Sequence, residues 1–288
     1  MPLLKVIVLA IVQGLAELLP VSSSAHVIVA EKLMGMDPAA PELTLLLVML
    51  HTGTMFAVIV YFWRTWSATY FSSATAFKQF AVRVILATAL TAIVGELIIK
   101  LIEHTVFATV PHAQIEDLFG HLEIIAPALA AAGILILVAG IAARRAPQPN
   151  ASAAELSVKQ AGLIGAVQGL CLPFRGFSRS GATISIGMLA GVEKARAESF
   201  SFALAVVLTP PVVAREVLRL MHAQKIQGTA DLATAVFPSV LGAVFAFAAG
   251  LVALRWLSRW LERGRWYFFG IYCLIGAVAV ALLHRAGY

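Results

Sequence analysis

The sequence predicts an all-α integral membrane protein with six transmembrane helices and two re-entrant helical hairpins, arranged as an inverted-topology repeat. Its composition is the first reason: 60% of the 288 residues are hydrophobic, 12% are charged, and the mean hydropathy is +0.90. Water-soluble proteins carry about 25% charged residues. This composition excludes soluble, disordered and coiled-coil classes, and two cysteines are too few for a disulfide framework.

Six apolar stretches are the second reason for this fold class. A helix that crosses the hydrocarbon core needs about 20 mostly apolar residues. The stretches of that length are residues 43–62, 80–101, 124–143, 200–220, 236–254 and 267–283. The sequence therefore predicts a multi-pass protein of the bilayer with six spans.

Two further apolar segments are broken by polar residues, which is the third reason. Residues 3–30 are interrupted by Pro20 and three serines, and residues 158–192 by Pro173 and the polar string at 175–180. Irregular backbone at membrane depth must be buried in protein or line a wet cavity. We therefore expect each segment to enter the membrane, turn, and leave on the same side.

The charges of the connecting segments predict the orientation. Segments 63–79, 144–159 and 255–266 are basic, whereas segment 102–123 has four acidic residues and no Lys or Arg. The positive-inside rule places the basic segments in the cytoplasm and the acidic one outside. The first hairpin then opens to the outside and the second to the cytoplasm. The net charge of +6 is explained by topology, so we expect no nucleic-acid partner.

The two broken segments begin an internal repeat. The string Gln-Gly-Leu occurs at 13–15 and again at 168–170, an offset of 155 residues. Three spans follow each hairpin, so the second copy is inverted relative to the first. We predict a single membrane domain made of two repeats, 1–143 and 158–284, with a binding site near the midplane where the broken helices meet.

The first broken segment carries an acid, a base and hydroxyls. Gln13 and Glu17 share one helix face, Pro20 ends the helix, and Ser23 and His26 follow. An ionisable residue within an apolar segment indicates a functional site. Such a set suits acid/base or nucleophilic catalysis. The alternative is structural: a paired carboxylate and a histidine that satisfies a local hydrogen bond.

The second broken segment suits an anion. Its string from Pro173 to Thr183 offers guanidinium groups, hydroxyls and glycines that let backbone amides approach an anion. A helix N-terminus after the break would add positive potential. The alternative is a polar surface loop that separates two helices. Together, the two segments predict phosphoester or diphosphate chemistry on an amphiphilic substrate.

These two strings, with His51-Thr-Gly-Thr54, resemble those of the undecaprenyl pyrophosphate phosphatase family of the bacitracin-resistance type. The resemblance implies six spans plus two re-entrant hairpins in the bacterial cytoplasmic membrane, with an outward-facing site. It implies hydrolysis of undecaprenyl diphosphate to the monophosphate, which recycles the lipid carrier for peptidoglycan synthesis and confers bacitracin resistance. It also implies a divalent cation, Mg²⁺ or Ca²⁺.

The family's functional positions fall on Gln13, Glu17, Ser23, His26, Ser178, Arg179 and Thr183. We assign catalytic roles to Glu17, His26 and Arg179. We assign phosphate binding to Ser23, Arg175, Ser178, Arg179, Ser180 and Thr183. We assign cation binding to Glu17 and Gln13.

This chain departs from the family pattern at three positions. Gln13 leaves one carboxylate where some members have two, which weakens a two-carboxylate metal site. Arg175 stands where many members have proline and adds either a phosphate contact or a structural pair. Ser199 stands where many members have arginine, so no role carries over.

Several alternatives stay open at this point. We favour His26 as nucleophile over a role as general acid or base, with water attack assisted by Glu17 as the competing route. A transporter or flippase for a phosphorylated polyprenyl lipid is the rival function, because inverted repeats with broken helices are typical of transporters. His51 either supports the site or bonds a neighbouring helix, and we slightly favour the helix contact. The sequence leaves a homo-oligomer open.

Overall fold

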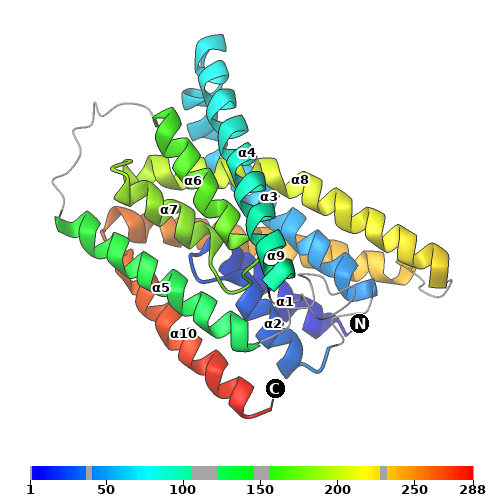
Figure 1. Ribbon diagram of the computed structural model, residues 1–288. Coiled ribbons are helices and arrows are strands. Elements are labelled where there is room, and N and C mark those ends of the chain that lie inside the picture. The colour runs from blue at the N-terminus through cyan, green and yellow to red at the C-terminus, as the bar shows by residue number, and fades with distance from the viewer. Residues whose placement is uncertain (1, 37–40, 106–121, 146–155, 228–231, 288) are drawn as a thin grey trace.

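The protein is helical throughout the residues that the computed structural model describes, which are 2–36, 41–105, 122–145, 156–227 and 232–287. In these ranges the helices are α1 (Leu3–Leu18), α2 (Ser23–Leu33), α3 (Pro41–Thr69), α4 (Ala74–Thr105), α5 (Leu122–Arg145), α6 (Val158–Cys171), α7 (Arg179–Leu189), α8 (Lys194–Gln227), α9 (Leu232–Glu262) and α10 (Tyr267–Arg285) (Figure 1). The all-α prediction is confirmed for these residues.

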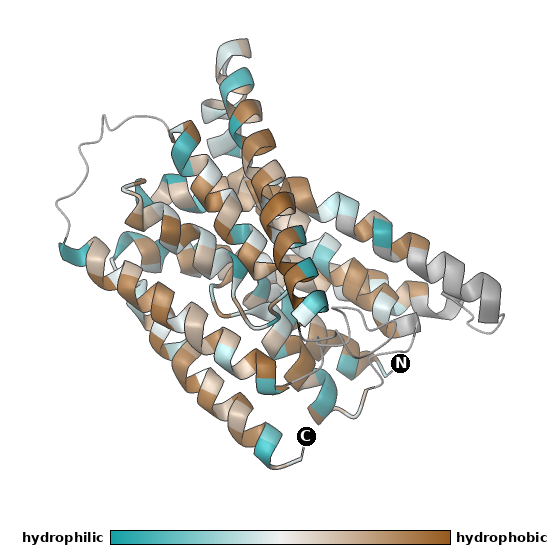
Figure 2. Cartoon of the chain, in the orientation of Figure 1, coloured by the Kyte–Doolittle hydropathy of each residue, from teal (hydrophilic) through white to brown (hydrophobic). Residues whose placement is uncertain are grey.

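Six helices are long and apolar enough to cross a membrane. The candidate spans are Leu43–Thr69, Ala74–Thr105, Leu122–Arg145, Lys194–Arg215, Val236–Glu262 and Tyr267–Arg285. Each contains or overlaps one predicted stretch, so the six predicted spans are confirmed. Figure 2 shows that apolar residues dominate α4, α5 and α10 along most of their lengths.

The spans are longer than their apolar cores, so two predicted loops are largely wrong. α3 continues to Thr69 and α4 begins at Ala74, which leaves a short turn within the predicted loop 63–79. α9 likewise continues to Glu262. Helical hydrogen bonds continue past the apolar run because arginine and tryptophan are compatible with helix at the membrane interface. Most of the predicted segments 102–123 and 144–159 lies outside the described residues.

Both broken segments form two short helices joined by a turn, as predicted. The first is α1–α2, and its break contains Pro20. The second is α6–α7, and its break begins at Leu172. Each second helix is capped by a serine: Ser22 accepts from the Ala25 N–H and Ser178 from the Gly181 N–H. Such caps satisfy amide groups that a helix start leaves unpaired.

Glycine in the repeated Gln-Gly-Leu string lets each hairpin pack closely against a long helix. A Cβ added at Gly14 of α1 would lie 2.6 Å from the Ala246 carbonyl oxygen of α9. A Cβ added at Gly169 of α6 would lie 2.8 Å from the Thr91 carbonyl oxygen of α4. Both contacts need glycine because any side chain would collide with backbone.

The two hairpin turns meet in the interior of the bundle. The Ser180 hydroxyl donates to the Leu19 carbonyl oxygen at 3.3 Å, and the Gly176 N–H donates to the Ser24 hydroxyl at 3.2 Å. In Figure 1 the turn before α7 lies beside α1 and α2, with α5 and α10 packed together along one side. The polar strings of the two hairpins are therefore joined in one place.

Candidate active site

Glu17 is the centre of the cluster that the two hairpins build. Its Oε1 accepts a hydrogen bond from an Arg179 Nη2 at 2.7 Å. Its Oε2 accepts from the Ser23 hydroxyl at 2.6 Å and from the Gln13 Nε2 at 3.1 Å. The Glu17 side chain is only 14% exposed. Charge-assisted bonds of this kind offset the cost of burying a carboxylate.

Two of the three donors to Glu17 lie at the starts of helices. Ser23 is the first residue of α2, and Arg179 is the first residue of α7. The positive ends of two helix dipoles therefore lie beside one carboxylate and one guanidinium group. Helix N-termini with free amide groups and an arginine are a suitable place for phosphate oxygens.

His26 lies one turn beyond Ser23 on α2, and its ring orientation is fixed on both sides. Its Nδ1 is 2.8 Å from the Ser22 carbonyl oxygen, which can only accept, so Nδ1 carries the proton. Its Nε2 is 2.7 Å from the Tyr272 hydroxyl of α10, which then donates. The two rings stack, with centroids 5.7 Å apart. The Nε2 lone pair thus accepts the Tyr272 hydrogen bond, and the catalytic role of His26 stays a prediction.

Ser22, which accepts the hydrogen bond from His26 Nδ1, has a strained backbone conformation. It has φ +68°, in the left-handed region that non-glycine residues rarely adopt. Its carbonyl binds His26 and its hydroxyl caps α2. Strain of this kind persists only where the surroundings fix it, and it concentrates at functional sites.

Gly176 joins the second turn to the first and to α5. It has φ +103°, and a Cβ added there would lie 2.5 Å from the Ile125 carbonyl oxygen. Its N–H donates to Ser24. Only glycine combines this φ with this approach to backbone, so the residue sets the distance between the two hairpins.

Comparison with known proteins gives a family. The family model described as bacitracin resistance protein BacA matches residues 6–279. The chain belongs to the BacA family. It is 57% identical over 277 residues to undecaprenyl-diphosphatase 2 of Acinetobacter baylyi, covering 95% of each chain. It is 35% identical over 286 residues to undecaprenyl-diphosphatase 2 of Burkholderia thailandensis (96% and 95% covered), and 29% identical over 283 residues to undecaprenyl-diphosphatase of Rhodopirellula baltica (98% of each).

Four of the predicted site residues of this BacA-family chain meet directly: Gln13, Glu17, Ser23 and Arg179. Three of them belong to the first broken segment, and Arg179 belongs to the second, 162 positions after Glu17. The sequence placed them in two segments, and the fold joins them.

Three other predicted residues lie in structural hydrogen bonds. Ser178 caps α7. Ser180 is buried and donates to the Leu19 carbonyl oxygen. Thr183 is buried and shares a hydrogen bond with Ser201 of α8. The roles of these three residues in phosphate binding stay predictions.

Arg175, which departs from the family pattern, interacts electrostatically with Glu31 of α2. Glu31 is buried, and its Oε1 makes no hydrogen bond with the described residues. Burial raises the pKa of Glu31 to about 7, and the positive charge of Arg175 opposes that rise. Arg175 itself is exposed. Arg175 of the second hairpin thus supplies a positive charge near the buried carboxyl group of Glu31 in the first hairpin.

Sequence reasoning missed one residue of the site and left another open. Tyr272, a single tyrosine in an apolar span, gave no signal in the sequence. His51 of α3 has its Nε2 3.8 Å from Glu17 Oε2, while its Nδ1 donates to the Leu47 carbonyl oxygen at 2.8 Å. The two interpretations of His51 coincide, because the neighbouring helix it approaches is α1 and the atom it approaches belongs to Glu17.

The donor set around Glu17 fits a cation only in partnership with phosphate. Among the described residues, no three side chains of His, Cys, Asp or Glu are grouped to hold a metal. One carboxylate, the amide oxygen of Gln13 and the Ser23 hydroxyl are hard oxygen donors. Mg²⁺ typically takes one or two carboxylates, with substrate phosphates and water completing its shell. The residues present match that mode rather than a closed protein cage.

Proposed function

We propose that this chain is an integral membrane phosphatase that hydrolyses undecaprenyl diphosphate to undecaprenyl phosphate and inorganic phosphate. The single observation that carries the proposal is the Glu17–Arg179 ion pair, which joins the end of α1 to the start of α7, with His26 on the next helix, α2. The curated relatives are named undecaprenyl-diphosphatases. Hydrolysis at this site recycles the lipid carrier for peptidoglycan synthesis, and a larger supply of the monophosphate underlies bacitracin resistance.

The two hairpins are re-entrant, the two halves form an inverted repeat, and the site faces the outside of the bacterial cytoplasmic membrane. Helix length supports this arrangement: α1 and α6 have 16 and 14 residues, about 24 and 21 Å, short of a hydrocarbon core of about 30 Å. The packing also supports it. α1 packs on α9 and α6 on α4, so the first helix of each half contacts the fourth helix of the other.

Arg179 and Ser23 bind the diphosphate. A guanidinium group has five N–H donors, and the bond to Glu17 leaves others for phosphate oxygens. Glu17 fixes the position of the guanidinium group before substrate arrives, so little reorganisation is needed on binding. The predicted contributions of Arg175, Ser178, Ser180 and Thr183 are secondary in this scheme, since three of them have structural partners.

His26 is the nucleophile. The Tyr272 hydroxyl gives up its hydrogen bond to Nε2, and the freed lone pair attacks the terminal phosphorus. A nitrogen–phosphorus bond forms, and the bond from that phosphorus to the bridging oxygen breaks. Undecaprenyl phosphate leaves with the bond's electron pair. Water then attacks the phosphorus of the phosphohistidine, the nitrogen–phosphorus bond breaks with its electron pair returning to Nε2, and inorganic phosphate and a proton are released to water. In the competing route, Glu17 takes a proton from water that attacks phosphorus directly, and His26 acts in proton transfer.

A divalent cation would be held by Glu17 and Gln13 together with phosphate oxygens. When bound, Mg²⁺ or Ca²⁺ neutralises negative charge on the phosphate oxygens. Arg179 already supplies part of that neutralisation from the protein, which is consistent with a site that has a single carboxylate.

Phosphate release by purified protein in detergent tests the proposal. Wild type would be assayed with undecaprenyl diphosphate, with and without chelator, beside Glu17→Ala, His26→Ala and Arg179→Ala. His104→Ala, which changes an exposed histidine at the end of α4, is the matched control. We expect each site variant to lose at least about 100-fold in rate. Unchanged release in His26→Ala would remove the nucleophile role, and no release from folded wild type would refute the phosphatase.

Transport of a phosphorylated polyprenyl lipid is the second candidate. Two short helix pairs that meet in the interior are the observation that favours it, because broken helices commonly form transporter sites. Movement of a labelled polyprenyl phosphate between leaflets of proteoliposomes tests it. Transport retained in His26→Ala would assign a separate activity to the same fold.

A further inference from the structure

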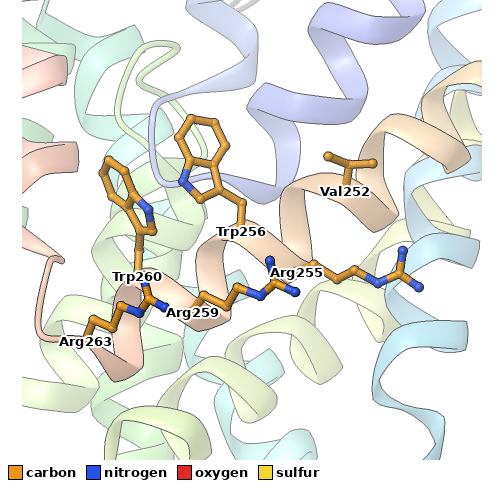
Figure 3. A pocket seen from close by; sticks show the side chains of 6 residues that line it. All are labelled: Val252, Arg255, Trp256, Arg259, Trp260 and Arg263. Carbon is orange, nitrogen blue, oxygen red and sulfur yellow. The ribbon is translucent and has the colours of Figure 1, made fainter.

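The C-terminal part of α9 carries three exposed arginines beside two tryptophans, and none of these residues belongs to the Glu17 cluster. Arg255, Arg259 and Arg263 follow one another at intervals of four, so they share one face of the helix. Figure 3 shows their side chains along one edge of α9 and the indoles of Trp256 and Trp260 on the adjoining side. A groove of about 390 Å³ is lined by these residues and Val252.

The three guanidinium groups form no ion pair with the described residues. All three arginines are exposed. None of their side chains makes a hydrogen bond with another residue in the described part of the chain. Three like charges lie within about 12 Å of helix axis, an arrangement that favours binding of an anion.

The apolar side of the groove indicates that the anion belongs to a lipid. Val252 is 57% exposed and Trp256 is 42% exposed, and both lie within the candidate span Val236–Glu262. Trp260 is held by Phe268 and Phe269 of α10, with ring centroids 5.7 and 5.3 Å away. Tryptophan is typical of the boundary between hydrocarbon and headgroups. A free phosphate ion would leave this apolar surface without a partner.

We propose that Arg255, Arg259 and Arg263, with Trp256 and Trp260, form a binding site for the phosphate headgroup of an anionic phospholipid. The guanidinium groups bind the phosphate oxygens, and the first part of an acyl chain lies on Val252 and Trp256. Basic residues at a membrane surface contribute about 1 kcal/mol each to attraction of anionic lipid. The site lies outside the diphosphate-binding cluster and uses none of its residues.

Thermal unfolding in lipid–detergent micelles tests the site. The probes are phosphatidylglycerol, phosphatidylcholine and inorganic phosphate at equal concentration. A ligand that binds the folded state raises Tm. We expect phosphatidylglycerol to raise the wild-type Tm by several degrees, and the other two probes to leave it unchanged. Equal stabilisation by phosphatidylcholine or by inorganic phosphate would refute an anionic lipid as the ligand.

The triple variant Arg255→Gln/Arg259→Gln/Arg263→Gln should lose most of the phosphatidylglycerol shift. The matched control is Arg64→Gln/Lys78→Gln/Arg145→Gln, which removes the same charge from other exposed positions and should keep the shift. If the first triple variant does not fold, Arg259→Gln alone should reduce the shift. An equal loss in both triple variants, or an undiminished shift in the variants of Arg255, Arg259 and Arg263, would overturn the proposal. The readout is Tm, so the result is independent of phosphatase activity.

Discussion

The two hairpins have the same helix–turn–helix form, but they contribute different side chains to the cluster around Glu17. Gln13 of α1 donates to Glu17, whereas Gln168 of α6, at the matching place in the repeated string, donates to Thr91 of α4 at 3.2 Å. The first hairpin supplies the carboxylate and the imidazole, and the second supplies the guanidinium group. The repeated glutamine thus bonds within its own helix in the first hairpin and to a neighbouring span in the second, while the ionisable groups of the cluster come from both hairpins.

Breaking the bond between the hairpins at Glu17 should have the largest effect. Glu17→Gln keeps the shape of the side chain but removes the charge that orients Arg179, and Arg179→Lys keeps the charge but removes the planar fork. We expect both to lower kcat/KM for diphosphate hydrolysis by about 100- to 1,000-fold. Steady-state phosphate release measures this, with Lys100→Arg at an exposed position as control. Activity within a few-fold of wild type in either variant would show that the pair has no part in the reaction.

A substitution that displaces the α6–α7 turn from the α1–α2 turn should have the second-largest effect. Gly176→Ala combines a strained φ with a contact of 2.5 Å to Ile125 backbone, whereas Gly191→Ala has a similar φ, +80°, and open space around the added Cβ. We expect Gly176→Ala to lower Tm by several degrees more than Gly191→Ala, and to lower activity with it. Thermal unfolding and phosphate release compare the two. Equal Tm losses would mean that φ strain alone matters at Gly176.

Substitution of Gln13 should mainly lower activity, whereas substitution of Gln168 should mainly lower stability. Gln13→Leu removes a donor to the Glu17 carboxylate, so kcat/KM should fall about 10-fold with little change in Tm. Gln168→Leu removes a fully buried partner of Thr91 and should lower stability by about 1 kcal/mol while activity persists. Kinetics and thermal unfolding are measured on both. Reversed effects would mean that the second hairpin, not the first, holds the reactive end of the substrate.

Much of this fold follows from local sequence, and part of it does not. Six spans and two breaks depend on apolar length, Pro20 and the serine caps, so the sequence predicted them. The meeting of the two broken segments was predicted, but the direct bond between Glu17 and Arg179 was not. Tyr272 was missed because its contact with His26 spans 246 positions and depends on how α10 packs. Glu31 was missed because its partner, Arg175, departs from the family pattern and the pairing depends on the meeting of two turns.

The interaction between Glu31 and Arg175 also predicts that the stability of the protein depends on pH. Burial raises the pKa of Glu31 from an ordinary 4.5 to about 7, so the folded state favours the protonated carboxyl. The stability that this preference contributes is complete below the unfolded pKa of 4.5 and is lost as the pH rises through about 7. Over that range the loss is on the order of 3 kcal/mol. Glu31→Gln stays neutral and avoids the loss.

The Tm of Glu31→Gln should therefore exceed that of wild type by several degrees at pH 8, and by much less at pH 5. Glu96→Gln, at an exposed carboxylate paired with Lys100, should show no such trend. A difference that is equal at both pH values would show that Glu31 is not held in its protonated form by burial. A wild type that is the more stable protein at pH 8 would show that the charge of Arg175 outweighs burial. The second hairpin would then stabilise the first through this ion pair.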